Sequence, residues 1–431
     1  MTNSLTPGKP AALLSSVLPP LIFGSATFNN LYNKSVPSDT VDLVKEALEL
    51  GVRAFDTSPY YGPSEELLGA ALDTEFVHQN VPREDLFILT KVGRIASDEF
   101  DYSPSWVRTS VARSLERLRT SYLDVVYCHD VEFVSEDAAM EAVQELRRIR
   151  DQEGTIKYVG ISGYPVDVLC KLAKRVLAET GEPLDVVMSY ANFTLQNTRL
   201  ATQGVKELRD AGVDVVPNAS VLGMGLLRKD GVPVGAQGDW HPSSPGLRAA
   251  IKRASDFCDR HGEKLEVIAI RYALESWITL GESVGSSGDP ASGIPWTPET
   301  NMQVGGRKFG VSVMGVSKSS ELRKTLQVWR SILDGLESGL ARRAGRWERD
   351  HEWSLNRRHA VQILADGVFE FLEEFHNYTW PSPPVGFINK LDKHGSLAVP
   401  QQPEIDLLTP AASPPPDDIQ TAQEVMTIPS R

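Results

Sequence analysis

The stretch LDVVYCHDVEFVSEDAAMEAVQELRRIRDQEGTIKYVGIS, residues 123–162, contains two apolar runs separated by a helical pattern. The runs LDVVYCH (123–129) and IKYVGIS (156–162) are short and almost continuously apolar, which is typical of strands buried on both faces of a parallel sheet. The intervening DAAMEAVQELRRIRDQEG (137–154) has apolar residues at helical spacing and ends at Gly154, a residue type common just past a helix end. The stretch therefore predicts a strand–helix–strand unit with parallel strands.

The same alternation of strand and helix extends over most of the chain. Six further short apolar runs are predicted as strands: PLIFG (20–24), VRAFDT (52–57), LFILTK (86–91), LDVVMSY (184–190), VDVVPNA (213–219) and VSVMGV (311–316). Eight strand–helix units of about 30 residues each match an α/β fold of the (β/α)8 TIM barrel type. A doubly wound sheet is the alternative, but it would place a glycine-rich turn after its first strand, where no GxGxxG occurs.

Four segments lie outside this repeat or interrupt it. Residues 1–19 form an N-terminal segment before the barrel, which is predicted over 20–338. Residues 281–310 are a Gly-, Ser- and Pro-rich insertion before the eighth strand, expected on the side of the barrel away from the strand ends. A helical extension follows over 339–391, and residues 392–431 have the composition of a disordered tail. The helical pattern of the extension covers 339–377, with an apolar stripe that is expected to pack on the outside of the barrel: Trp347, Trp353, Val361, Leu364, Phe369 and Leu372.

The composition argues against several classes of function. The formal net charge of the 431 residues is −13, and a chain without a basic cluster is poorly suited to bind a nucleic acid or an anionic membrane. No apolar run approaches the roughly 18 residues of a membrane span. The cysteines Cys128, Cys170 and Cys258 are far apart and form neither a CxxC pair nor a metal-ligand spacing, so we expect no disulfide framework and no metal site. The expectation is a cytoplasmic monomer or small homo-oligomer that acts on a small molecule.

Four side chains at or just after predicted strand ends carry chemistry. Asp56 ends the second strand, Tyr61 lies in the loop behind it, Lys91 ends the third strand, and His129 ends the fourth. Each alone has an ordinary structural interpretation, such as a helix cap, a solvated lysine, a core histidine or a packed tyrosine. In a barrel, however, the carboxyl ends of neighbouring strands meet at one mouth, where active sites lie. The four residues are therefore predicted to converge on one site.

The chemistry of this set fits proton transfer. A free phenol has a pKa near 10, and a nearby ammonium group lowers it by favouring the phenolate. Lys91 could supply that charge, Asp56 could keep the lysine charged and oriented, and His129 could hydrogen-bond a substrate oxygen. The set contains neither an HExxH motif nor a carboxylate cluster for a metal. A lysine Schiff-base aldolase, which also uses a strand-end lysine in a barrel, remains an alternative.

Several motifs give the chain a resemblance to a known family. RAFDTSPYYG (53–62), LTKVG (89–93), SLERLRTSYLDVVYCHD (114–130) and GTIKYVGIS (154–162) resemble, in order, the signatures of the aldo-keto reductase superfamily over about residues 20–335. The resemblance implies a barrel enzyme that moves a hydride between a nicotinamide and a carbonyl or alcohol. It implies Tyr61, rather than Tyr60, as proton donor or acceptor, because the family tyrosine lies five residues after the aspartate. Lys91 would tune Tyr61, Asp56 would pair with Lys91, and His129 would orient the substrate.

Further details resemble the D-arabinose and L-galactose dehydrogenase group of that superfamily: SPYYG (58–62), CHDVEF (128–133), GISGYP (160–165), SYANF (189–193) and NASVLGMGLL (218–227). This likeness implies oxidation of the anomeric carbon of an aldose, such as D-arabinose, to a 1,4-lactone. A general NADPH-dependent aldehyde or ketone reductase remains an alternative, as does a nicotinamide-binding regulatory subunit.

The resemblance also implies the contacts of the cofactor. Ser162 and Ser189 take the positions expected to hold the carboxamide, and Gly315 and Ser317 could offer backbone amides to phosphate. Glu321 stands where phosphate-binding relatives have an arginine. Because a carboxylate repels a 2′-phosphate and can bind ribose hydroxyls, NAD is favoured over NADP, although NADP stays possible. The other interpretation of Glu321 is a favourable charge in the first turn of the last barrel helix.

Overall fold

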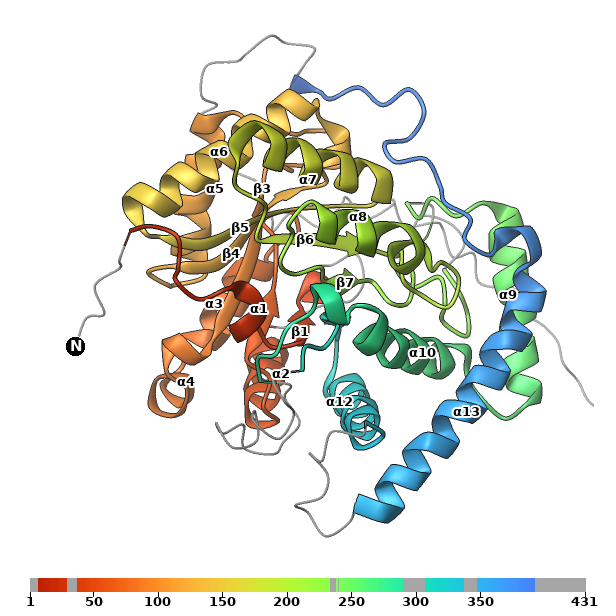
Figure 1. The fold of residues 1–431 in the computed structure, drawn as a ribbon. Helices are drawn as coiled ribbons and strands as arrows, with labels where there is room; N and C mark the ends of the chain where they lie inside the picture. Colours follow the sequence, from red (N-terminus) through yellow and green to blue (C-terminus); the bar gives the residue numbers. More distant parts are fainter. Residues whose placement is uncertain are drawn as a thin grey trace, which may run out of the picture. The chain divides into compact units, whose positions relative to one another are not determined.

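The computed structural model describes residues 7–28, 37–232, 238, 240–289, 307–336 and 347–391. Its central element is a closed barrel of eight parallel strands in sequential order, in which the first strand pairs with both the second and the eighth (Figure 1). The strands are β1 (Leu21–Gly24), β2 (Ala54–Asp56), β3 (Phe87–Val92), β4 (Leu123–His129), β5 (Ile156–Gly163), β6 (Val186–Tyr190), β7 (Asn218–Ala219) and β8 (Ser312–Gly315). The predicted TIM barrel is confirmed.

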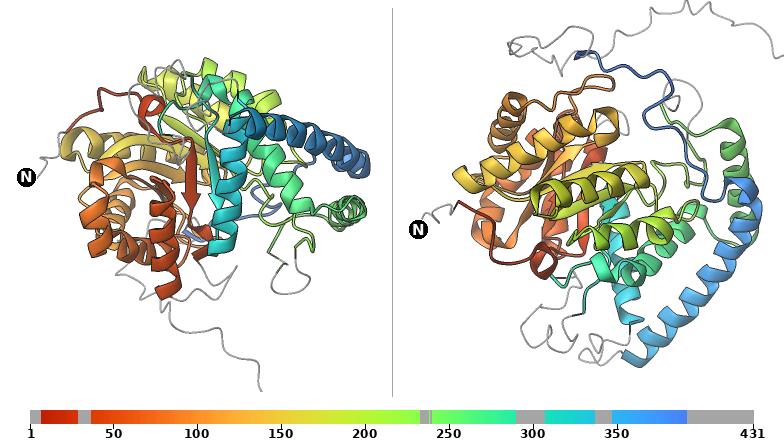
Figure 2. Two further views of the ribbon diagram at one scale, coloured as in Figure 1. Left: turned by 90° about the horizontal axis from the view of Figure 1, so that it is seen from below. Right: turned by 45° about the horizontal axis from the view of Figure 1, so that its top comes forward.

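Helices surround the barrel (Figures 1 and 2). The helices of this layer are α2 (Pro37–Glu49), α3 (Ser64–Leu72), α4 (Glu75–Asn80), α5 (Pro104–Arg117), α6 (Glu136–Glu153), α7 (Val166–Thr180), α8 (Val205–Asp210), α9 (Pro245–Arg260), α10 (Leu265–Leu280) and α12 (Ser319–Asp334). The apolar faces of most of these helices and the outward-facing strand residues form one continuous core between sheet and helices, whereas α9 and the first half of α10 pack in a separate apolar cluster.

A second apolar cluster fills the lumen of the barrel. Its members come from alternate positions on all eight strands, as expected because side chains alternate between the two faces of a strand. On β3 and β4, for example, Leu89, Val125 and Tyr127 face the lumen. This alternation decides which side chains at the strand ends can reach the mouth of the barrel.

The predicted seventh strand is wrong in length. Residues 213–219 were expected to form it, but only Asn218 and Ala219 do so, with Val215 making an isolated bridge to Val186. Pro217 lies between these pairings, and a proline has no N–H to donate to a neighbouring strand. The apolar pattern therefore indicates the burial of the segment but not the extent of its pairing.

The N-terminal residues close the barrel at the end opposite the mouth. The short helix α1 (Leu14–Val17) and Leu18 belong to the lumen cluster and precede β1. The ends of the predicted insertion 281–310 pack here, since the Ser286 hydroxyl donates to Ser15 O at 3.0 Å and Lys308 Nζ donates to the Ser15 hydroxyl at 2.9 Å. These ends thus lie away from the strand C-termini, as predicted. The insertion's residues 290–306 lie outside the described part of the chain.

The predicted extension is helical over α13 (Trp347–Leu372), which packs along α9 and α10 (Figures 1 and 2). Val361, Leu364 and Leu372 of the predicted stripe are buried there. The prediction is wrong for Trp353, which was placed in the apolar stripe packed on the barrel but has a side chain that is 57% exposed. The helix also stops before 377, giving way to a short 3-10 turn and then to irregular backbone. Residues 339–346 of the extension and the predicted disordered tail, 392–431, lie outside the described residues.

Candidate active site

The strand ends bring three of the four candidate catalytic side chains to the barrel mouth. Asp56, Lys91 and His129 each lie two residues beyond a lumen-facing residue of the same strand, so all three point inward at the C-terminal ends of β2, β3 and β4. Tyr61 follows β2 in a tight loop, where its amide donates to Ser58 O at 3.0 Å. The structure therefore brings together all four residues that the sequence predicts.

Asp56 and Lys91 form a buried ion pair. Lys91 Nζ lies 2.7 Å from Asp56 Oδ1 and donates to Thr57 O at 2.8 Å, and the two side chains are only 2% and 5% exposed. Burial alone would lower the pKa of Lys91, but the charges of Asp56 and Tyr61 raise it above its usual value. Lys91 is thus held as a cation with its charge 4.9 Å from the centre of the Tyr61 ring.

The side chains of Tyr61 and His129 lie next to each other at the mouth. Their rings meet edge to face at 89° with centroids 5.8 Å apart, and Ser58 Oγ lies 3.1 Å from His129 Nδ1. Burial lowers the pKa of His129 to about 3, so its imidazole is neutral at physiological pH. Burial also raises the pKa of Tyr61, and Lys91 only partly offsets this effect. The sequence-based expectation of a lowered phenol pKa is therefore wrong in net direction, although Lys91 acts in the expected sense.

The second tyrosine has different partners. The hydroxyl of Tyr60 accepts a hydrogen bond from Arg94 at 3.0 Å, and the Arg94 guanidinium stacks 3.8 Å from the centre of the Tyr60 ring. Of the two adjacent tyrosines, Tyr61 has a described cation–π contact with Lys91, whereas the described cation–π contact of Tyr60 is with Arg94. The choice between the two adjacent phenols is thus supported by their surroundings.

Ser162 and Gly315 are placed where a dinucleotide could contact them. Ser162 faces the lumen beside His129, and within the described part of the chain its hydroxyl makes a single long contact, of 3.5 Å to Cys128 O. Gly315 is exposed at the end of β8, where a side chain would meet nothing nearer than Thr27 at 3.9 Å. Next to it, α12 begins at Ser319, and its N-cap residue Lys318 makes no side-chain cap, which leaves the first amides of the helix available to a phosphate. The described residues therefore fit a nicotinamide dinucleotide.

Ser189 is not brought to this site. It lies between Met188 and Tyr190 on β6, and Met188 belongs to the lumen cluster, so alternation turns Ser189 to the outer face. There it is fully buried and accepts a hydrogen bond from Asn192 at 2.9 Å. A register error of one residue explains the wrong assignment, and Met188 is the residue that faces the lumen.

Ser317 and Glu321 bind each other in this structure. The Glu321 carboxylate accepts the Ser317 amide at 3.0 Å and the Ser317 hydroxyl at 2.7 Å, and it lies 3.7 Å from Lys318. The expected free amide at Ser317 is therefore wrong for this state. The arrangement also matches the simpler interpretation of Glu321, since a carboxylate in the first turn that reaches back stabilises a helix start.

The sequence analysis missed a group of polar residues at the mouth. Arg94 and Asp130 form an ion pair beside His129, and Glu132, also buried, accepts the Tyr164 amide at 3.1 Å. Gly93, directly after the third strand, could have pointed to Arg94, because a glycine after a strand end commonly marks a turn that redirects the chain.

The mouth is also crossed by residues far away in sequence. We define residues 376–391 as the C-terminal segment, which passes over the loops that follow β3, β4, β5 and β6. Its contacts are Asn389 with the backbone of Phe100, Phe387 with Phe133, Ser382 with Glu132, Trp380 stacked on Tyr164, and Asn377 with Thr198. These loops are thereby tied to one another across the top of the barrel.

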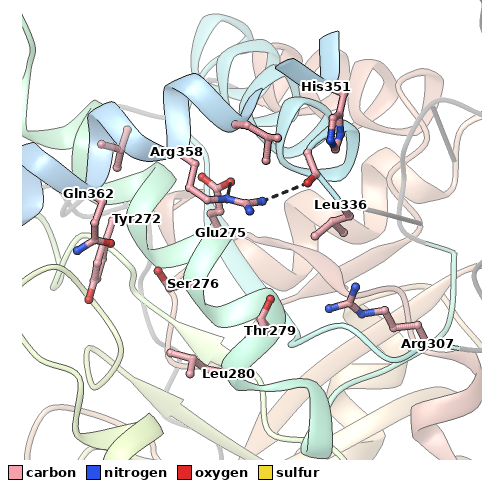
Figure 3. A pocket seen from close by; sticks show the side chains of 13 residues that line it. Tyr272, Glu275, Ser276, Thr279, Leu280, Arg307, Leu336, His351, Arg358 and Gln362 are labelled. Atoms are coloured by element: carbon pink, nitrogen blue, oxygen red, sulfur yellow. Dashed lines mark hydrogen bonds and ion pairs between the residues drawn. The ribbon is translucent and has the colours of Figure 1, made fainter. Parts of the chain in front are cut away.

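A separate cavity of about 510 Å³ lies outside the barrel, between α10, α12 and α13 (Figure 3). Arg358 stands at its edge, bonded to Glu275 at 2.7 Å and to Gly335 O at 3.3 Å. None of the candidate catalytic or cofactor residues lines it. The barrel mouth, and not this cavity, is therefore the candidate active site.

Comparison with known proteins agrees with the geometry. The profile of the Aldo/keto reductase family matches residues 20–335. The chain belongs to the aldo/keto reductase family. Membership makes the protein an oxidoreductase that uses a nicotinamide cofactor and a small-molecule substrate. Among the residues that the structure describes, none of the helices has the length and apolar character needed to cross a membrane.

Three curated relatives show where this aldo/keto reductase lies within the family. D-arabinose 1-dehydrogenase of Saccharomyces cerevisiae is 43% identical over 270 residues, covering 62% of this chain and 78% of the relative. L-galactose dehydrogenase of Arabidopsis thaliana is 38% identical over 268 residues, covering 62% and 79%. D-threo-aldose 1-dehydrogenase of a Pseudomonas species is 27% identical over 303 residues, covering 64% and 88%. All three are named as dehydrogenases of a sugar.

Proposed function

We propose that this aldo/keto reductase oxidises the anomeric carbon of an aldose, D-arabinose or a related sugar, to the 1,4-lactone. The observation that carries the proposal is the buried Asp56–Lys91 pair beneath Tyr61, which faces the neutral His129 at the same mouth. The sugar substrates in the names of the three relatives support the choice of an aldose.

In the proposed reaction the substrate loses one proton and one hydride. The C1 hydroxyl loses its proton to the Tyr61 phenolate, and the C1–H bond breaks with its electron pair, so a C1=O bond forms and the product is a lactone. When bound, the nicotinamide accepts that hydride. Lys91 lowers the cost of the phenolate, and Asp56 keeps Lys91 charged and in place. His129, neutral because of its burial, hydrogen-bonds the reacting oxygen without adding charge.

For the cofactor we propose NAD in preference to NADP. Glu321 places a carboxylate at the start of α12, where it would repel a 2′-phosphate. The pair that Glu321 forms with Ser317 would have to open before its oxygens could bind ribose hydroxyls. Lys318, 3.7 Å from Glu321, works against this preference, so the ratio of activity with the two cofactors measures which charge dominates.

One observation favours a second candidate, the reduction of aldehydes or ketones with NADPH. Because burial raises the pKa of Tyr61, the phenol is protonated near neutral pH and is ready to donate a proton to a carbonyl oxygen. Reduction would therefore be the easier direction at low pH, and oxidation would gain as the pH rises.

The test is a screen of aldoses for NADH or NADPH formation, run with NAD and NADP in parallel and with Tyr61→Phe and Tyr60→Phe as variants. We expect oxidation of D-arabinose or a close relative, faster with NAD, and a loss of about 10²- to 10⁴-fold in kcat for Tyr61→Phe. Tyr60→Phe keeps the Tyr61 phenol and controls for loss of the other hydroxyl. Full activity in Tyr61→Phe would refute the proposed roles. Reduction of simple aldehydes without oxidation of any aldose would favour the second candidate.

A further inference from the structure

Arg94 returns to the barrel mouth because of a turn directly after β3. Gly93 adopts φ 99°, a conformation that residues with a side chain rarely adopt. A Cβ at this position would lie 2.4 Å from the ring of Tyr102, so the turn requires glycine for space as well. Three residues after Lys91, the chain therefore places a second cation at the mouth.

The guanidinium of Arg94 is held on several sides. It stacks on Tyr60 and donates to the Tyr60 hydroxyl, pairs with Asp130, and donates to Ala96 O at 3.4 Å. Arg94 is only 16% exposed. A guanidinium has five N–H donors, and the three bonds described leave two of them for another partner.

Asp130 is held in an unusual conformation next to the candidate catalytic histidine. Its φ of 57° lies in the left-handed region, which is uncommon for residues with a side chain. The carboxylate is 3% exposed, and its Oδ2 lies 3.7 Å from His129 Nε2. Such strain at a site is retained where the surrounding structure imposes it, commonly next to bound ligands. Asp130 and Arg94 thus put a buried acceptor and a buried donor beside the atom that would contact the reacting oxygen.

We propose that Arg94 and Asp130 determine the specificity of this site for polyhydroxylated substrates by binding the hydroxyl on C2, next to the anomeric carbon. The carboxylate accepts a hydrogen bond from the hydroxyl, and a free N–H of the guanidinium donates to the hydroxyl oxygen. The inference rests on the proposed function, since it names the part of an aldose that the same site recognises. A substrate without that hydroxyl leaves both buried groups without a partner, which makes its binding unfavourable.

The chain contains a matched control for the structural alternative, in which Arg94 only braces the loops. Arg83 also stacks 3.8 Å from a tyrosine ring, that of Tyr122, and bonds an aspartate, Asp124, at 2.8 Å. Asp124 lies near the start of β4, whereas Asp130 follows its end. The two clusters therefore have the same chemistry at opposite ends of the barrel.

The experiment compares kcat/KM for D-arabinose and for 2-deoxy-D-ribose, which is its 2-deoxy analogue. We expect the wild-type protein to prefer D-arabinose by about 10- to 100-fold, the equivalent of one charged hydrogen bond. In Arg94→Met and in Asp130→Asn the ratio falls toward one, mainly through a higher KM for D-arabinose. Arg94→Lys keeps a donor and retains part of the preference. Arg83→Met keeps the wild-type ratio.

The outcomes separate the two proposals. If the wild-type protein oxidises D-arabinose but the variants lose both substrates in parallel, Arg94 and Asp130 are structural and only this inference is overturned. If no aldose is oxidised, the proposed function falls and this inference falls with it. Should Arg94→Met fail to fold, as judged by thermal unfolding, the ratios of Asp130→Asn and Arg94→Lys decide the question.

Discussion

The substitution Lys91→Met tests the buried ion pair directly. It removes the ammonium that lies 2.7 Å from Asp56 and leaves a carboxylate that is 5% exposed. The other oxygen of that carboxylate, Oδ2, has no hydrogen-bond partner among the described residues. Removing one partner of a buried pair typically costs about 3–5 kcal/mol, because an uncompensated charge remains in the interior. We expect a loss of that size in the free energy of unfolding.

The stability that Lys91→Met loses should increase with pH. Burial raises the pKa of Asp56 and Lys91 lowers it, so the substitution raises this pKa further above its value in the unfolded chain. A carboxyl group with a raised pKa contributes full stability below its unfolded pKa and loses it as the pH rises through the folded value. Lys91→Met should therefore lose more stability at pH 8 than at pH 5, relative to the wild-type protein.

The assay is equilibrium urea unfolding of the wild-type protein, Lys91→Met and the double variant Asp56→Asn/Lys91→Met at both pH values. The double variant carries no buried charge and should recover much of the loss. Lys157→Met is the matched control, because Lys157 pairs with Asp124 at 3.1 Å but is 37% exposed, and such pairs contribute at most about 1 kcal/mol. A loss below about 1 kcal/mol for Lys91→Met at pH 8, or additive losses in the double variant, would refute the reasoning.

Three further predictions concern protonation and packing. The imidazole of His129, whose pKa burial lowers to about 3, should show no titration between pH 5 and 8 when followed by NMR, and a midpoint near 6.5 would contradict the buried geometry. Burial raises the pKa of Glu132 to about 8, so the protein loses the stability due to this group as the pH rises from about 4.5 through 8; Glu132→Gln should gain in melting temperature relative to the wild-type protein at pH 9 and not at pH 5. Gly69→Ala would place a Cβ 2.0 Å from Arg117 O, so α3 and α5 must separate, at a cost of about 1–3 kcal/mol in the free energy of unfolding, and an unchanged urea midpoint would show that the helices have room.

Much of the barrel and its central site follows from local sequence patterns. Each predicted strand other than the seventh lies within two residues of the observed one, because strands buried on both faces are read from continuous apolar runs. Asp56, Lys91 and His129 converge because the closed barrel turns every strand end to one mouth. These features follow either from sequence patterns a few residues long or from the barrel topology alone.

Other features depend on details that periodicity does not contain. Ser189 was misassigned because a slip of one residue reverses the face of a strand. The net rise in the pKa of Tyr61 depends on how deeply the ring is buried, which motif spacing does not reveal. The contact of Asn389 with Phe100 spans 289 positions, and no local pattern predicts a pairing across that distance.

The C-terminal segment also has a consequence for how the protein is made. Chains fold from the N-terminus onward during synthesis, at about 5–20 residues per second. All eight strands are present once Gly315 has been synthesised, yet Asn389, which binds the backbone at Phe100, follows 74 positions later. A nascent chain can thus close its barrel while the loops around Lys91 and His129 still lack their last tether. The candidate active site is therefore completed in the last part of translation, even though its candidate catalytic residues are encoded in the first third of the chain.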